Sequence, residues 1–457
     1  MNSDRKIRVR TLCRLAIPAF VENVINALFG IVDTAMLKKT SASALYIAAI
    51  GSTGALNNLT KCVVTFFLIG LTVVVSQHYG RGEKEFCSKI TAKIFPFAAA
   101  VGVILSVLCS IFSLNIVDFL TENKEIVPHA AEYYRIISLG YTALVIKALA
   151  TAALRGVGIS TIPMIYNLFS GALNVGLNWC LIGGHLGFPA LELRGAAIAT
   201  VMSESAAAVI ALCMLLFAKT PVRILGVHPL KNNRAGIRDF MKLGSSSAAE
   251  QLVLQIGAVI TSTVISRLST LSMAAYHVNQ SVDAIAWAIG GAFCAASTTM
   301  SGMSFGRGDT GEVRKSTCLT LGAAYAVGAA ASIAYIVFGR QIASFYTDEP
   351  EVIDLAARAL AVSAFTLFGI VTHQTIAGSM RGIGRPRSPL LASLISLWVF
   401  RVLGCYLCVV RLNLGVLAVV ACVLADQWVR GLINVILWIR AMRKTETADK
   451  HRITDLQ

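Results

Sequence analysis

Several long stretches of this sequence are apolar and carry no charged residue. Residues 94–117 and 316–339 each form such a run of 24 residues, and residues 284–306 form one of 23. A helix rises about 1.5 Å per residue and the hydrocarbon core of a bilayer is about 30 Å thick. Each run is therefore long enough to cross a membrane. The sequence predicts a multi-pass integral membrane protein and excludes soluble and secreted enzymes.

The composition agrees with this prediction. Hydrophobic residues make up 56% of the 457 residues and charged residues only 14%, against about 25% charged residues in a typical soluble protein. The 11 cysteines lie mostly within apolar runs, where a thiol packs as a small hydrophobe. Cys405 and Cys408 have no second cysteine pair or ligand histidine nearby, and the histidines are dispersed. We therefore expect no metal or redox cofactor and no enzymatic activity.

The basic residues are distributed unevenly between the two sides of the predicted bundle. Of the 40 Lys and Arg residues, 27 fall in the termini and alternate loops on one side, and 7 fall in the loops on the other. Because basic loops stay in the cytoplasm, both termini are predicted to be cytoplasmic, in the cell (plasma) membrane. The net charge is +16, and the basic cytoplasmic face is expected to contact the anionic headgroups of the lipid bilayer. No basic patch is interleaved with aromatic residues, so a nucleic-acid partner is not expected.

The apolar runs between polar and Gly/Pro breaks predict twelve transmembrane helices. Their ranges are 12–37, 44–79, 91–119, 128–154, 161–183, 195–218, 237–266, 271–305, 316–346, 351–380, 388–410 and 415–441. The unusually long second and eighth helices are expected to tilt or to extend into the cytoplasm.

The two halves of the chain repeat the same turn motifs at a fixed offset. Residues 79–83 (YGRGE) match residues 305–309 (FGRGD), and residues 154–158 (LRGVG) match residues 380–384 (MRGIG), both at an offset of 226. This repeat predicts an all-α fold of twelve helices in two pseudo-symmetric six-helix bundles with a cavity between them. The predicted domains are a tail (1–11), an N-terminal lobe (12–218), a linker (219–236), a C-terminal lobe (237–441) and a second tail (442–457).

Ten ionisable residues fall within the predicted helices, where each is costly if it faces lipid. They are Glu22, Asp33, Lys61, Lys147, Glu204, Glu250, Asp283, Arg401, Asp426 and Arg430. Asp426 and Arg430 have the i, i+4 spacing of an ion pair on one helix. Arg401 could join that pair, and we favour a structural network there.

Four of these residues are candidates to line a substrate cavity: Glu22, Lys61, Glu250 and Asp283. Glu22 and Glu250 occupy matching repeat positions, and each could instead be hydrogen-bonded within its lobe. Lys61 needs a partner, for which Glu22 or Asp33 are nearest in the sequence. Asp283 and Glu204 could line the cavity or pair internally, and Lys147 could snorkel to the cytoplasmic surface.

Asp33, Asn174 and Asn178 suggest a cation site. A carboxylate inside helix 12–37 stays ionised only beside a cation or hydrogen-bond donors, which favours a proton or sodium switch. A carboxylate at the outer interface is the alternative. The two asparagines, at i, i+4, project from one face. With Thr200 and a backbone carbonyl they offer hard oxygen ligands suited to an alkali cation, although asparagine pairs also join helices.

Motifs along nearly the whole chain resemble those of the multidrug and toxic compound extrusion (MATE) transporters, prokaryotic type. They include FGIVDTAM at residues 29–36, SQHYGRGE at 76–83, LNVGLNWCLIGGHLGFPALELRGAAIAT at 173–200 and SMRGIGRPRSPL at 379–390. The resemblance implies two six-helix bundles. It also implies antiport, by a rocking type of alternating access, of amphipathic and usually cationic organic compounds against entering Na⁺ or H⁺.

The resemblance also implies a cation-coupling site. Asp33, Asn174, Asn178 and Thr200 stand at the matching positions, with Ala196 supplying a carbonyl, and Na⁺ is the metal ion that they could hold. Asn178 departs from the pattern, because those relatives carry Asp there. With one negative charge fewer, the site is expected to hold a cation less tightly or to act as a one-proton switch.

Alternatives remain open at this stage. Lys61 and Lys147 are unusual beside an organic-cation path, so an exporter or flippase for an anionic or zwitterionic metabolite or a lipid-linked precursor is the second hypothesis. A membrane enzyme, a receptor or a channel fits less well. No G-x-x-x-x-G-K-[ST] motif occurs, so direct drive by ATP is not expected. We expect a monomer whose partners are a small organic substrate and the bilayer.

Overall fold

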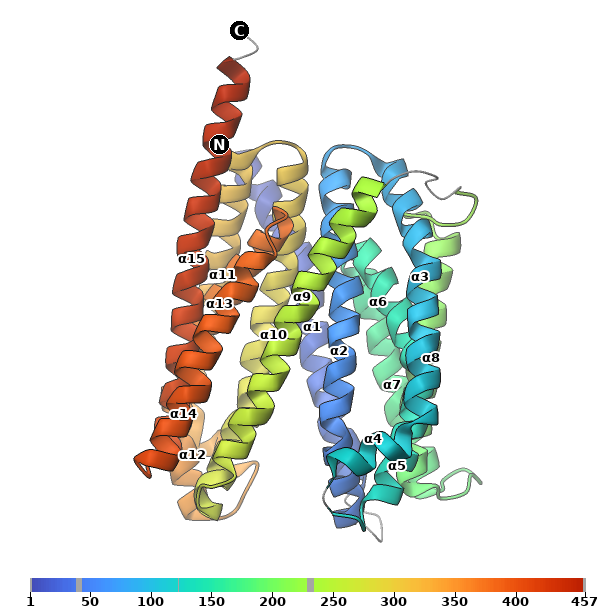
Figure 1. The fold of residues 1–457 in the computed structure, drawn as a ribbon, viewed down its shortest axis with the longest axis vertical. Helices are drawn as coiled ribbons and strands as arrows, with labels where there is room; N and C mark the ends of the chain where they lie inside the picture. Colours follow the sequence, from blue (N-terminus) through green and yellow to red (C-terminus); the bar gives the residue numbers. More distant parts are fainter. Residues whose placement is uncertain (1, 38–42, 122, 228–233, 455–457) are drawn as a thin grey trace. The chain divides into compact units, whose positions relative to one another are not determined.

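The described part of the chain in this computed structural model consists of helices joined by short loops (Figure 1). The structure describes the backbone of all residues except 1, 38–42, 122, 228–233 and 455–457. Side chains are in addition left undescribed at residues 2, 3, 27, 30–35, 37, 43, 44, 47, 55 and 448–454.

The helices follow the predicted order along the chain. The first half contains α1 (Asn2–Leu37), α2 (Ser43–Gly80), α3 (Lys84–Ile111), α4 (Ser113–Leu120), α5 (Val127–Leu139), α6 (Tyr141–Gly156), α7 (Thr161–Gly183) and α8 (Glu192–Phe217). The second half contains α9 (Arg234–Ile265), α10 (Thr270–Gly306), α11 (Thr310–Ser344), α12 (Pro350–Gly382), α13 (Arg387–Ser396), the π-helical η1 (Leu397–Leu403), α14 (Gly404–Tyr406), the π-helical η2 (Leu407–Arg411) and α15 (Val416–Thr454).

Length and apolar character identify the membrane-spanning segments. Within the described residues, nine helices are long and apolar enough to cross a bilayer, and the bent pair α5–α6 makes a tenth. The helices α1 and α7 occupy the places of the two remaining predicted spans. The fold is thus the predicted all-α membrane architecture.

Two predicted spans are less regular than expected. The helix predicted over 128–154 is bent by 43° between α5 and α6, at Gly140. A side chain there would crowd Val201 of α8, 3.3 Å from the position of an added Cβ, and glycine weakens a helix interior. The helix predicted over 388–410 passes through the π-helical turns η1 and η2, and Arg401, a residue of the buried ionic network, lies in η1.

Contacts divide the chain into two compact units, described here separately. Residues 21–248 form the N-unit, and residues 1–20 with 249–457 form the C-unit. The start of α1 belongs to the C-unit because Leu12, Leu15 and Ala16 are buried in the same apolar core as Ile289 of α10. Arg8 also pairs with Glu312 of α11 at 2.8 Å. The predicted lobe, linker and tail boundaries remain predictions.

The repeated turn motifs have the same backbone geometry in both units. Gly82 and Gly308 have φ of 84° and 77°, and Gly158 and Gly384 have φ of 85° and 79°. These left-handed conformations favour glycine because it has no Cβ. In each copy of the second motif, the glycine N–H donates to the carbonyl of the arginine three residues earlier, at 2.9 Å. The internal repeat predicted from the sequence is therefore confirmed at these turns.

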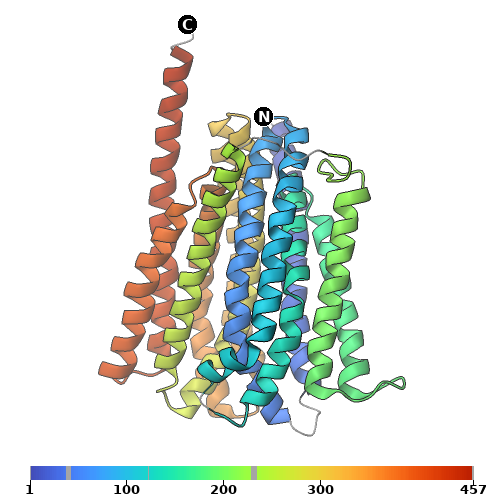
Figure 2. The ribbon, with the colours of Figure 1, turned by 45° about the vertical axis from the view of Figure 1, so that its right-hand side comes forward.

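Helices at the end of the chain pack within the C-unit. The helix α13 lies beside α15, and α15 continues past the neighbouring helices of its own unit before the chain ends (Figures 1 and 2). In the N-unit, α7 packs against α8. This second pair carries most of the candidate site.

Candidate functional site

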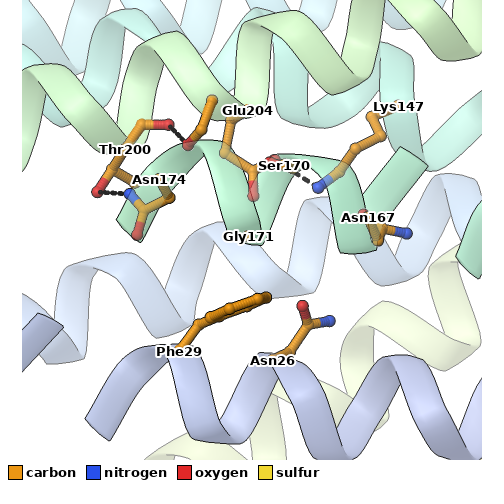
Figure 3. Close-up of a pocket in the computed structure, with 10 residues that line it drawn as sticks. Asn26, Phe29, Lys147, Asn167, Ser170, Gly171, Asn174, Thr200 and Glu204 are labelled. Atoms are coloured by element: carbon orange, nitrogen blue, oxygen red, sulfur yellow. Dashed lines mark hydrogen bonds and ion pairs between the residues drawn. The ribbon is translucent and has the colours of Figure 1, made fainter. Parts of the chain in front are cut away.

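A polar cavity of about 260 Å³ lies inside the N-unit. It is lined by Asn26, Phe29, Lys147, Asn167, Ser170, Gly171, Asn174, Thr200, Ser203 and Glu204, which come from α1, α6, α7 and α8 (Figure 3). Seven of these ten side chains carry neutral polar or acidic oxygen groups, and one carries an ammonium. Such a lining favours ions and polar groups over purely apolar ligands.

The close approach of α1 to α7 depends on a glycine. A Cβ added at Gly171 would lie 1.7 Å from Cε2 of Phe29, so only glycine leaves room for the ring in this position. Figure 3 shows the Phe29 ring extending from α1 toward α7 beside Gly171. The ring forms the apolar part of the cavity wall, and Asn26 lies one turn earlier on the same helix.

Four of the five predicted cation-site residues are brought together by hydrogen bonds. Asn178 Nδ2 donates to Asn174 Oδ1 at 3.2 Å, and Asn174 Nδ2 donates to Thr200 Oγ1 at 3.4 Å. The Thr200 hydroxyl donates to the carbonyl oxygen of Ala196 at 2.9 Å. Asn174 and Asn178 are buried, as the one-face spacing on α7 predicts. The chain of bonds joins α7 to α8.

Asp33 is the fifth predicted residue of that site. Its backbone belongs to α1, but its side chain lies outside the described residues. Its role as the ionisable member of the site stays a prediction.

Lys147 and Glu204 form an ion pair across the cavity wall. The lysine side chain is 12% exposed and the glutamate 30%, and they come from α6 and α8. Glu204 both pairs internally and lines the cavity, so the structure combines the two roles considered for it. Pairing neutralises the lysine charge that a buried position would otherwise penalise.

Glu22 and Glu250, the matched acidic candidates, each pair with an arginine of their own unit. Arg155 donates to Glu22 at 2.7 Å and Asn167 donates to it at 2.9 Å. In the C-unit, Arg381 donates to Glu250 at 2.6 Å, and Ser393 adds a longer bond of 3.2 Å. Both glutamates are therefore hydrogen-bonded within their own unit, which is the alternative given above. Neither glutamate lines the N-unit cavity.

The other two substrate candidates have different surroundings. The Lys61 side chain on α2 is exposed, and among the side chains that the structure describes it forms no ion pair. Asp283 on α10 is half-buried and accepts a hydrogen bond from Asn279 at 3.1 Å, while Ser363 donates to Asn279 at 3.0 Å. Asp283 thus belongs to a small polar cluster within the C-unit.

The ionic network predicted near the end of the chain is present. Arg430 donates to both carboxylate oxygens of Asp426 at 2.7 and 2.8 Å, and Arg401 lies 4.0 Å from the same carboxylate. The Ser396 hydroxyl also donates to Asp426. Asp426 and Arg430 are fully buried, and this confirms the structural interpretation.

Sequence reasoning missed several residues of these sites. The distribution of basic residues places Arg155 and Arg381 on the cytoplasmic side, but in the structure each pairs with the matched glutamate of its own unit. The two arginines are 226 residues apart and the two glutamates 228, and this similar spacing is the signal that could have identified the pairs. Asn26, Asn167 and Ser203 line the cavity. They carry no net charge, so no charge signal in an apolar run draws attention to them.

Comparisons with known proteins agree on one family. The family model MatE matches residues 18–180 and 247–407, which is most of the chain. A probable multidrug resistance protein NorM from Thermotoga maritima is 26% identical over 453 residues, covering 98% of this chain and 96% of that protein.

Two solved structures share the fold. A crystal structure of MATE in the straight conformation superposes with a TM-score of 0.89 at 19% identity, covering 96% of this chain and 97% of that one. A MOP superfamily transporter from Pyrococcus furiosus, for which reverse polarity of the binding pocket suggests a different function, superposes with a TM-score of 0.88 at 18% identity, with the same coverage.

Proposed function

This chain belongs to the MatE family of multidrug transporters, and from that premise we propose that it is a secondary active antiporter. In this proposal it exports amphipathic, mainly cationic organic compounds in exchange for H⁺ or Na⁺. It acts as a monomer in the cell membrane with both termini in the cytoplasm. Alternating access arises from a rocking movement.

The observation that carries the proposal is the hydrogen-bonded group of Asn174, Asn178, Thr200 and the Ala196 carbonyl in the N-unit. Amide, hydroxyl and carbonyl oxygens are ligands that suit an alkali cation or a hydrated proton. The group joins two helices that both line the polar cavity. A cation gained or lost there would change how α7 and α8 are held together.

Such a site can drive transport only through unequal affinities. A ligand shifts a conformational equilibrium by its differential binding to the two states. We propose that Asp33 and the oxygen group bind the entering cation in the outward-open state. The change in this group then lowers the affinity for the organic substrate, which leaves the cell.

The test is export of a fluorescent organic cation from cells that express the protein. We expect Asp33→Asn to reduce export to the level of cells without the transporter, because the titratable charge is gone. Asn174→Ala is expected to weaken coupling, since it removes the link between Asn178 and Thr200. Equal export by wild type and Asp33→Asn would remove Asp33 from the mechanism.

Two titrations identify the coupling ion. Varying Na⁺ at fixed pH, and then varying pH without Na⁺, shows which ion changes the export rate. A rate that responds to neither ion would contradict antiport by this site.

Export of an anionic or zwitterionic compound, or a flippase activity toward a lipid-linked precursor, is the second candidate. It is supported by the exposed Lys61, which has no ion-pair partner among the described side chains. The reverse pocket polarity of the Pyrococcus furiosus transporter offers a precedent within the same fold. Loss of binding with Lys61→Ala for an organic anion, and not for an organic cation, would favour this candidate.

A further inference from the structure

The lysine in the N-unit cavity is not one of the predicted cation-site residues described above. Lys147 extends from α6 and pairs with Glu204 of α8, and both side chains line the cavity (Figure 3). Because Lys147 is only 12% exposed, its ammonium is held among the polar groups of the cavity. The lysine ammonium therefore stands within the same space as the Asn174–Thr200 bond.

The cavity contains the ligands that an alkali cation needs. Glu204 is the only carboxylate among the described lining residues, and Thr200, Ser170 and Ser203 add hydroxyl oxygens. Hard oxygen ligands of this kind bind small cations with little transition-metal preference. In the protein as it stands, however, the positive charge beside the carboxylate is a lysine ammonium on a covalent tether.

We propose that the Lys147 ammonium is the resident cation of the N-unit cavity and that it excludes Na⁺. The inference rests on the proposed ion coupling and deepens it, because exclusion of Na⁺ leaves H⁺ as the coupling ion of the two that were proposed. A second positive charge beside the ammonium is unfavourable, because like charges repel strongly where little water screens them. Na⁺ would also compete with Lys147 for the Glu204 carboxylate, to which the ammonium is already paired.

Removal of the ammonium should convert the cavity into a sodium site. Lys147→Met keeps an unbranched apolar side chain of similar length but leaves the Glu204 carboxylate without its cation. A partly buried carboxylate without a counter-charge favours the uptake of one. Na⁺ can then bind to Glu204 and the neighbouring hydroxyl oxygens of α7 and α8.

The experiment measures equilibrium binding of radioactive sodium to the purified full-length protein in detergent. Tris chloride holds the ionic strength constant. We expect no saturable binding by the wild type, and binding of about one ion per chain by Lys147→Met, at least about tenfold tighter than any wild-type binding. The double variant Lys147→Met with Glu204→Gln should lose this binding, because the carboxylate ligand is gone.

A matched control removes a lysine of the same chemistry outside the cavity. Lys89 pairs with Glu85 in the first two turns of α3 at 2.6 Å, so Lys89→Met breaks a Lys–Glu pair without touching the cavity. It should bind sodium no better than the wild type.

Two results would overturn the inference. One is saturable sodium binding by the wild type that disappears with Thr200→Ala. The other is a folded Lys147→Met protein that binds no more sodium than the wild type. Such binding by the wild type overturns the inference even where Lys147→Met does not fold. Since the readout is binding, a failure of drug export in cells would count against the proposed function alone.

Discussion

At the scale of single residues, the packing of α1 against α7 beside the cavity depends on the missing side chain of Gly171. Gly171 lets the Phe29 ring lie against α7, within 1.7 Å of where a Cβ would stand. Gly176, five residues later on the same helix, has no atom within 4 Å of an added Cβ. The two glycines therefore differ in packing although they share a helix.

Substitution of Gly171 by alanine should destabilise the protein by about 1–3 kcal/mol, the usual cost of overpacking, because the Phe29 ring must move. The matched Gly176→Ala variant should be neutral or slightly stabilising, since alanine favours a helix over glycine. Chemical unfolding in detergent measures both, and addition of Phe29→Leu should recover part of the loss. Equal stability of the two alanine variants would contradict the packing described here.

At the scale of helices, an ion pair in each unit links one helix to the end of another, just before a glycine-containing turn. Glu22 on α1 meets Arg155 at the end of α6, and Glu250 on α9 meets Arg381 at the end of α12. All four side chains are between 6% and 12% exposed. The arginines stand directly before the turns of Gly158 and Gly384, so these pairs link a helix interior to the repeated motif.

Removal of either acid should destabilise its unit, because it leaves a buried guanidinium without a counter-charge. We expect about 3 kcal/mol for Glu22→Gln and for Glu250→Gln, the range for breaking a buried pair. Glu85→Gln, which breaks an exposed pair on α3, should have little effect. Thermal unfolding of the three variants tests this, and the same small effect for all of them would show that the two pairs are not structural.

At the scale of the whole molecule, the architecture can be predicted from the sequence more fully than the contacts between side chains can. Runs such as 316–339 require spans, and the offset between residues 154–158 and 380–384 gives the repeat. The pairing of Asp426 with Arg430 follows from helical spacing alone. Lys147 and Glu204 are 57 residues apart on different helices. Their contact depends on how α6 and α8 pack, so no local sequence pattern predicts it.

The central claim is that an inward cation gradient drives outward movement of an organic compound. Purified protein in proteoliposomes tests it most directly, with a fluorescent organic cation as substrate and imposed gradients of H⁺ or Na⁺. Transport of the substrate against its own gradient, in the direction opposite to the imposed ion flux and lost with Asp33→Asn, is the predicted result. Substrate movement that only follows its own gradient, at a rate unchanged by either ion, would contradict the account.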